Sequence, residues 1–245
     1  MRRVPVILLC LAVVGIVVVH LGNDVLRVFE SGRGSRSIGS PAAGRLVHGK
    51  RLPSSGPGFR TYSRLGSLLG RTTVHSAVRA TVLDAYAEVH DQHPDLRFVV
   101  GETGWPRGGR IRPHRTHQNG MSVDFMVPVR RSDGVAELPG RPWNKFGYGI
   151  EFDESGVAGE LQIDFEAMAL HLERLRAAAR THGLVIERVI FAPELHPELF
   201  ATEAGRRIRH SLPFTTGRVW IRHDEHYHVD FAFKGTESVS SKAEE

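Results

Sequence analysis

The segment His226-Tyr-His-Val-Asp-Phe-Ala-Phe233 alternates titratable and apolar side chains, and this alternation decides the fold that we predict. Neighbouring side chains of a β-strand point to opposite faces of the sheet. His226, His228 and Asp230 therefore share one face. The other face carries the apolar side chains Tyr227, Val229, Phe231 and Phe233. The segment predicts a strand that buries its apolar face in a core and presents imidazole and carboxylate groups on the other face.

A second alternating segment lies over residues 121–129. One of its faces carries the apolar side chains Met121, Val123, Phe125 and Val127. Asp124 lies on the opposite face. Neighbouring strands lie about 4.8 Å apart, so a metal ion can bridge Asp124 and His228 if these two strands are neighbours. His117, within the turn-rich stretch 113–120, would supply a third ligand.

These residue types favour a catalytic zinc site. The sequence has 14 His but a single Cys, Cys10, so a zinc site here must use imidazole and carboxylate ligands. Two neutral imidazoles and one carboxylate leave a fourth position for water, as catalytic zinc sites do. His226 would then lie near that water and either take its proton or stabilise charge on a tetrahedral intermediate. Either role makes His226 the candidate catalytic residue.

Two further carboxylates are each open to two interpretations. Glu102 follows a predicted strand and is either a site carboxylate or, as is commoner at such positions, a charge on a surface loop. Asp230 either orients a ligand imidazole or is a solvated strand residue.

The remaining hydrophobic patterns predict a mixed fold. Helical spacing indicates helices, and shorter apolar runs indicate strands. The helices are expected at 73–90, 165–181 and 194–210, and the strands at 97–100, 184–191 and, with an interruption, 218–233. No Gly-rich phosphate-binding turn interrupts them, so we predict the α+β class, with a central, mainly antiparallel sheet and flanking helices. Hydrophobic residues make up 41% of the chain, which excludes a disordered protein.

The N-terminus carries an export signal. Two arginines and Pro5 precede an apolar run of 14 residues, Val6 to Val19. Such a run is short for a spanning helix, which needs about 20 residues, and typical of a signal-peptide core. Including Val4, His20 and Leu21 makes an anchor feasible, and no small-x-small cleavage site follows. We therefore predict a signal peptide or signal anchor at 1–22, a short linker at 23–35, and export.

The charge pattern gives no sign of nucleic-acid binding. The net charge of +5 falls to +3 without Arg2 and Arg3, and the other arginines are scattered. No basic stripe with interleaved aromatic residues is present in the sequence, so we predict no nucleic-acid partner.

The site residues resemble a known group of enzymes. His117-x6-Asp124 with His226-x-His228 is similar to the ligand pattern of the zinc peptidases grouped with lysostaphin, D-Ala-D-Ala carboxypeptidases and hedgehog. A fuller set of motifs resembles the penicillin-insensitive murein endopeptidase family. The motifs are Gly108-Gly109, His114-x-x-His117-Gln118-x-Gly120-x-x-Val123-Asp124, His223-x-x-His226-x-His228, Ser37-Ile-Gly-Ser, Gly44-x-Leu46 and Leu52-Pro53-x-x-Gly56-Pro57. The resemblance covers roughly residues 36–233 and implies a fold like that of hedgehog and the D-Ala-D-Ala peptidases.

The resemblance also implies roles for particular residues. His117, Asp124 and His228 would be zinc ligands, and His226 the catalytic base or intermediate stabiliser. His114 and His223 would line the site, where they would bind substrate or a second metal, or support the ligands. Residues 36–235 would form the catalytic domain, including the Gly-, Pro- and Ser-rich stretch that composition alone marks as a linker, and 236–245 a disordered tail.

The implied reaction is hydrolysis of peptide cross-links in peptidoglycan, between D-alanine and diaminopimelate, in the periplasm or at the outer face of the inner membrane. Two alternatives stay open: a D,D- or L,D-carboxypeptidase acting on the stem peptide, and a zinc-stabilised wall-binding module without turnover. The chain departs from the family in lacking its disulfide-forming cysteines and in placing Met121-Ser122 where Leu-Asp is usual. The oligomeric state is not specified by the sequence.

Overall fold

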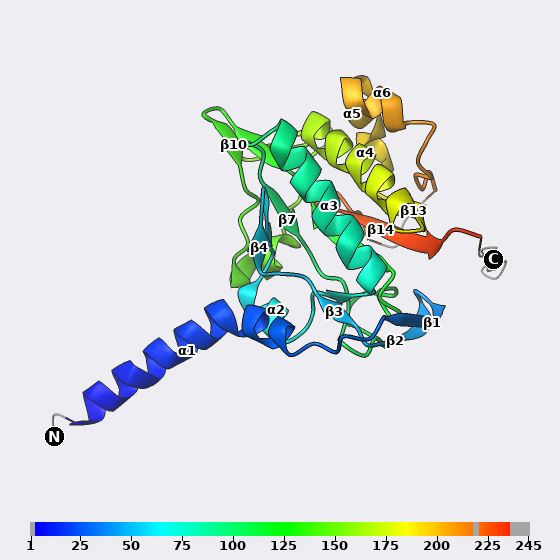
Figure 1. Cartoon of the computed structure of the whole chain (residues 1–245). Helices are drawn as coiled ribbons and strands as arrows, with labels where there is room; N and C mark the ends of the chain where they lie inside the picture. Colours follow the sequence, from blue (N-terminus) through cyan, green and yellow to red (C-terminus); the bar gives the residue numbers. More distant parts are fainter. Residues whose placement is uncertain (1–2, 218–220, 236–245) are drawn as a thin grey trace.

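A six-stranded sheet lies at the centre of the molecule (Figure 1). The computed structural model describes residues 3–217 and 221–235, so the predicted disordered tail at 236–245 lies outside the described residues. The strand order is β13 (Leu184–Ile190), β14 (His226–Phe233), β8 (Ser122–Met126), β7 (Phe98–Val100), β5 (Phe59–Thr61) and β4 (Ser55–Gly56). Neighbours in this order run antiparallel except β5 and β7, which are parallel. The α+β class and the mainly antiparallel sheet are therefore confirmed.

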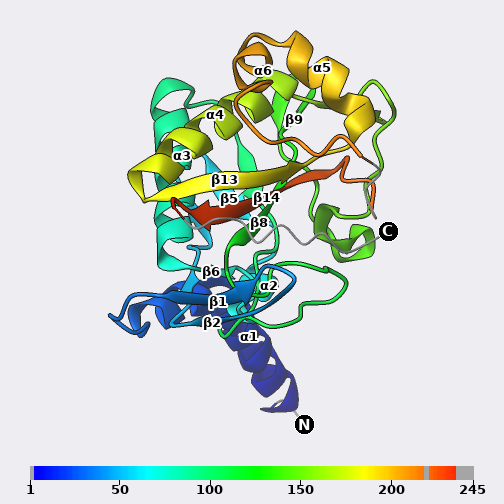
Figure 2. The same ribbon diagram turned by 90° about the vertical axis from the view of Figure 1, so that its right-hand side faces the viewer.

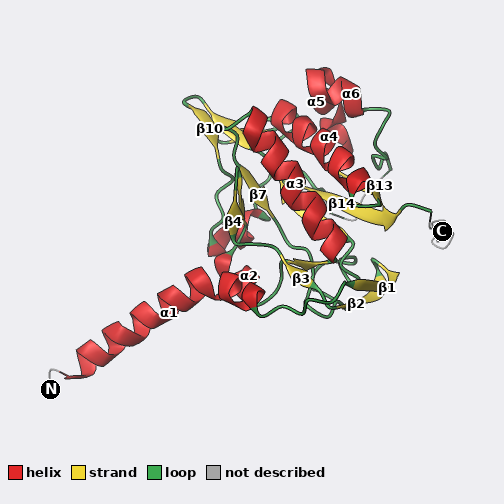
Figure 3. Ribbon diagram, in the orientation of Figure 1, coloured by secondary structure: helices red, strands yellow, loops and turns green. Residues whose placement is uncertain are grey.

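Two long helices, α3 (Ser76–Gln92) and α4 (Phe165–Thr181), cover one face of this sheet (Figure 3). The apolar face of β14 packs against α4, where the Tyr227 hydroxyl lies 2.6 Å from Nδ1 of His171. Burial lowers the pKa of His171 to about 3, so its neutral ring accepts the hydrogen bond from Tyr227. Tyr227, Val229 and Phe231 of the predicted apolar face are therefore buried in the core, whereas Phe233 at the end of the strand is exposed.

A smaller antiparallel sheet adjoins the central one. Its strands, in order, are β10 (Gly134–Ala136), β9 (Val129–Arg131), β12 (Leu161–Ile163) and β11 (Val157–Ala158). Between β10 and β11 the chain forms a short 3-10 helix, η1 (Pro142–Gly147), which is followed directly by Tyr148. This connection brings Tyr148 to the face of the central sheet that α3 and α4 leave uncovered, where its hydroxyl contacts Asp124.

The Gly-, Pro- and Ser-rich stretch folds onto the domain, as the resemblance implies. It forms β1 (Arg36–Ser40), β2 (Ala43–Val47) and β3 (Lys50–Arg51), and β3 pairs with β6 (Thr73–Val74). The β1–β2 hairpin lies beside the loop that contains His117, as two backbone hydrogen bonds show: Leu46 N donates to Arg107 O, and Gln118 N donates to Pro41 O. Figure 2 shows this hairpin below the central sheet.

The apolar N-terminal run belongs to a helix longer than the run itself. Helix α1 (Arg3–Val28) projects from the domain (Figure 1), and α2 (Arg64–Leu68) lies at its base. The stretch Val6–Val28 is long and apolar enough to cross a membrane. Asn23, near the end of α1, is fully buried in the domain. Asn23 therefore attaches the end of α1 to the folded domain.

The predicted single helix at 194–210 is wrong. The structure has three short helices there: η2 (Pro193–Leu195), α5 (His196–Ala201) and α6 (Glu203–Ile208). Thr202 separates the last two because its backbone is extended, with φ −71° and ψ 163°. Its side chain accepts a hydrogen bond from Gly205 N, so Thr202 caps the start of a new helix.

Candidate metal centre

Two strands of the central sheet bring Asp124 and His228 together. Strands β8 and β14 pair antiparallel with Asp124 directly opposite His228. The side chains of directly opposite residues lie on the same face of a sheet. Nδ1 of His228 lies 2.8 Å from Oδ1 of Asp124, and both side chains are buried. The two alternating segments thus pair in the register that places their polar faces together.

A loop adds His117 to this pair. Nε2 of His117 lies 3.1 Å from Oδ1 of Asp124, and its ring centroid lies 4.7 Å from that of His228. The backbone of His117 is left-handed, with φ 69°, and Gly120 continues the turn with φ 77°. Nδ1 of His117 contacts the carbonyl oxygen of Thr103 at 3.3 Å. Nε2 is buried and, among the described residues, has no hydrogen-bond partner.

His114 lies on the other oxygen of the same carboxylate. Its Nδ1 is 3.6 Å from Oδ2 of Asp124, and its Nε2 is 2.8 Å from Oε2 of Glu102. His114, His117 and Asp124 each offer a ligand atom within 4.8 Å of the other two, a spacing that can hold a metal ion. His114 therefore belongs to the group of residues that could hold a metal ion.

His226 also faces Asp124. Nε2 of His226 lies 3.8 Å from Oδ2 of Asp124, and Nδ1 lies 2.9 Å from Oε1 of Glu225. The ring of His223 lies 4.7 Å from that of His226, centroid to centroid. Burial and the neighbouring His226 lower the pKa of His223 to about 4, so its ring is neutral. All six residues that the sequence predicts for the site lie in one cluster.

Asp230 orients His228. The carboxylate of Asp230 lies 2.9 Å from Nε2 of His228, accepts a hydrogen bond from Ser122 Oγ at 2.5 Å, and contacts Arg188 at 2.6 Å. Burial alone would raise the pKa of Asp230, but His228 and Arg188 hold it well below its ordinary value. Of the two interpretations of Asp230, the structure supports the one in which it positions an imidazole, since its exposed fraction is 1%.

Glu102 is a buried member of the site, so its interpretation as a surface charge is wrong. It accepts hydrogen bonds from the Tyr62 hydroxyl at 2.7 Å and from two nitrogens of Arg71, at 2.7 and 2.6 Å. Burial raises the pKa of Glu102, but the bonds to His114, Arg71 and Tyr62 outweigh burial and lower it to about 2. The carboxylate that holds His114 is therefore charged.

Two further residues that contact the cluster, Tyr148 and Glu225, are not predicted from the sequence. The Tyr148 hydroxyl donates to Oδ2 of Asp124 at 3.1 Å and accepts a hydrogen bond from Glu102 N at 2.8 Å. Glu225, on the loop before β14, holds His226. The position of Glu225 next to a predicted site imidazole was a usable signal, whereas no local pattern marks Tyr148.

The donor set fits a divalent cation with a preference for nitrogen and oxygen ligands. Nitrogens of His117 and His228 converge on Asp124, and Nε2 of His117 is buried without a hydrogen-bond partner among the described residues. The second nitrogen of each ring is held, by Thr103 O in one case and Asp230 in the other. Rings supported in this way are typical of metal-ligating histidines.

The fold is of the α+β class and its buried cluster could hold a metal ion. Comparison with known families places the chain more closely. Residues 37–243 match the profile of the penicillin-insensitive murein endopeptidase family, and the chain belongs to this family. The family match makes the protein a hydrolase of peptide bonds, with peptidoglycan as the substrate that the family acts on. No match to a curated protein was found.

Proposed function

We propose that this protein is an exported zinc metallopeptidase that hydrolyses peptide cross-links of peptidoglycan. The observation that carries the proposal is the convergence of four imidazoles on the buried carboxylate of Asp124, each with a ring nitrogen within 3.8 Å of it. The family match supplies the substrate class.

In this proposal His117, Asp124 and His228 hold the zinc ion. Nε2 of His117 and Nδ1 of His228 are the donor atoms, because their other ring nitrogens are engaged by Thr103 O and Asp230. When bound, zinc supplies Lewis acidity, which polarises the scissile carbonyl and makes a water molecule acidic enough to attack at neutral pH.

His226 is the residue that transfers a proton from the attacking water to the leaving amine. Its Nδ1–H donates to Glu225, which leaves Nε2 as the acceptor that faces the site. Nε2 takes a proton from the attacking water and passes it to the nitrogen of the leaving amine. His114 and His223 border this position and, in our proposal, contact the substrate or support the ligands. No side chain needs to form a covalent acyl intermediate.

A digest of purified peptidoglycan tests the proposal. We expect the full chain, kept soluble in detergent, to convert cross-linked muropeptide dimers to monomers. The reaction should stop when a chelator is added and resume when zinc is added back. Release of terminal D-alanine with the dimers intact would instead establish the carboxypeptidase alternative. Dimers and stem peptides that both stay unchanged with every divalent metal tested would overturn the proposal.

Asp230→Asn should weaken zinc binding without abolishing it. The substitution keeps the size of the side chain but removes the charge that holds Nε2 of His228, and losing such a partner typically lowers metal affinity about 10–100-fold. Competition with a fluorescent zinc chelator measures the affinity. Glu187→Gln, at an exposed carboxylate on the adjacent strand, is the matched control. Unchanged affinity in the Asn variant would argue that His228 is not a ligand.

We also propose that the chain acts in the periplasm or at the outer face of the inner membrane. The apolar helix α1 supports export, and the family substrate lies outside the cytoplasmic membrane. The domain boundaries 1–22, 23–35 and 36–235 are part of this proposal.

A further inference from the structure

We propose that the base of the domain binds the membrane surface, with anionic phospholipid as its ligand. The proposed surface has two parts: the apolar side chains Leu65 and Leu69 at helix α2, and a cationic pocket at the end of α1. The inference requires α1 to be retained as an anchor. It does not depend on the peptidase chemistry, because neither part contacts the metal centre.

The length of α1 places the membrane boundary at the domain. From Val4 to Gly22 the helix has no Asp, Glu, Lys or Arg. At 1.5 Å per residue these residues span about 28 Å, close to the roughly 30 Å of a bilayer core. The next residue, Asn23, is buried and donates to Leu52 O at 3.0 Å and to Ser54 Oγ at 3.2 Å. The end of the helix is therefore attached to the folded domain at the level where the hydrocarbon ends.

Helix α2 lies at this boundary. Its residue Leu68 packs against α1 so closely that a Cβ added at Gly22 would come within 2.7 Å of Leu68 Cδ1. Arg64 donates to His20 O of α1 at 3.2 Å. Leu65 and Leu69 nevertheless have exposed fractions of 47% and 58%. Exposed leucines beside a membrane-spanning helix are suited to burial in the interface between headgroups and acyl chains.

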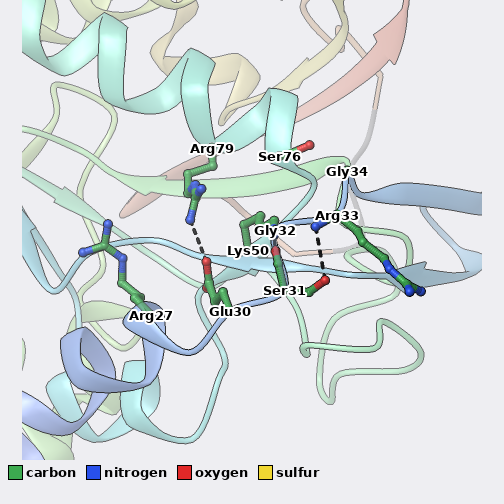
Figure 4. A pocket seen from close by; sticks show the side chains of 9 residues that line it. All are labelled: Arg27, Glu30, Ser31, Gly32, Arg33, Gly34, Lys50, Ser76 and Arg79. Atoms are coloured by element: carbon green, nitrogen blue, oxygen red, sulfur yellow. Dashed lines mark hydrogen bonds and ion pairs between the residues drawn. The ribbon is translucent and has the colours of Figure 1, made fainter.

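The cationic pocket lies just beyond the boundary (Figure 4). Its volume is about 460 Å³, and its charged lining residues are Arg27, Glu30, Arg33, Lys50 and Arg79. Glu30 contacts Arg79 at 2.8 Å, and Arg27 contacts Asp24 at 3.2 Å. Among the described residues, neither Arg33 nor Lys50 has a carboxylate partner, and Lys50 instead donates to the Ser31 carbonyl. The pocket thus has an excess of positive charge.

The position of the pocket indicates that the anion it would bind is the phosphate of a lipid headgroup. Arg27 is five residues beyond Gly22 on the same helix. At 1.5 Å per residue it lies about 7 Å above the edge of the hydrocarbon, which is the depth of the headgroups. The export that we propose for this chain places the domain, and with it the pocket, at the outer leaflet of the membrane. Phosphodiester groups of that leaflet then face the pocket.

Site-specific fluorescence quenching tests the apolar part. Cys10→Ser removes the only cysteine, and Leu69→Cys or Val185→Cys then introduces a single attachment point for a bimane probe. Val185 is a matched control because it is 38% exposed but lies on β13, away from α1. With the full chain in vesicles, lipids that carry a spin label near the headgroup should quench the probe at 69 several-fold more than at 185. Equal quenching would overturn the proposal.

Lipid retention tests the cationic part. Native mass spectrometry of the detergent-solubilised full chain, with phosphatidylglycerol and phosphatidylcholine in equal amounts, should show preferential retention of phosphatidylglycerol and an intact residue 1–22 segment. One basic residue near an anionic lipid surface is worth about fivefold in binding, so Arg33→Gln should reduce the preference by about that factor. Arg131→Gln, an exposed arginine on β9, should not. A mature protein without residues 1–22 would contradict the inference. So would a preference for phosphatidylglycerol that Arg33→Gln leaves unchanged.

Discussion

Replacing Asp124 by Asn is expected to abolish both zinc binding and hydrolysis. Asp124 is the one carboxylate on which His114, His117, His226 and His228 converge. The amide keeps the shape of the side chain, so β8 should still pair with β14, but it lacks the negative charge that a cation needs. We expect hydrolysis to fall by about 10³-fold or more, since the Lewis acid contributes several kcal/mol to the barrier reduction.

Elemental analysis and the muropeptide digest, run on the same preparation, measure this effect. Wild type should contain one zinc ion per chain and the variant none. Asp133→Asn, at an exposed position in the β9–β10 turn, controls for the substitution itself and should behave as wild type. A variant at 124 that keeps both its zinc and its activity would show that the metal, if any, is held elsewhere.

Replacing His226 by Ala is expected to separate binding from turnover. In our proposal His226 moves a proton and does not hold the ion, so zinc content should stay at one per chain. The turnover number should fall by about 10²–10⁴-fold, the usual contribution of a general acid–base group. Glu225→Gln should give a smaller loss, because the amide can still accept the hydrogen bond from Nδ1 but without charge.

The measurements are the turnover number on cross-linked muropeptides and the zinc content, with exposed His210→Ala as the matched control. The same variant decides between an enzyme and a wall-binding module without turnover. If the Ala variant at 226 supports wall function in cells as well as wild type does, the protein acts by binding and the enzymatic proposal is wrong.

The two strands that carry the site were predictable because each buries one face. A strand with one apolar face cannot shift by one residue without exposing that face, so burial fixes the register as well as the orientation. Val123 and Val229 on the core side therefore bring Asp124 and His228 together on the other side. The sequence pattern determined both strands and the direction of their polar side chains.

The residues around the ligands were less accessible from sequence. Glu102 and Tyr148 lie in irregular segments whose positions depend on packing between distant parts of the chain, so no periodicity marks them. The break between α5 and α6 has a different origin. The apolar spacing is helical throughout this region and predicts one continuous helix. The hydrogen bond that the Thr202 side chain accepts from Gly205 N stabilises a new helix start instead.

The β1–β2 hairpin supports the loop that carries the proposed zinc ligand His117. Gln118, next to His117, is fixed through Pro41 O, and Gly109 N donates to Gln118 O at 2.8 Å. These bonds support the left-handed turn that carries His117. If the site holds zinc as we propose, they would keep the ligand loop in place when the ion leaves, and activity would then follow the supply of free zinc in the surrounding compartment.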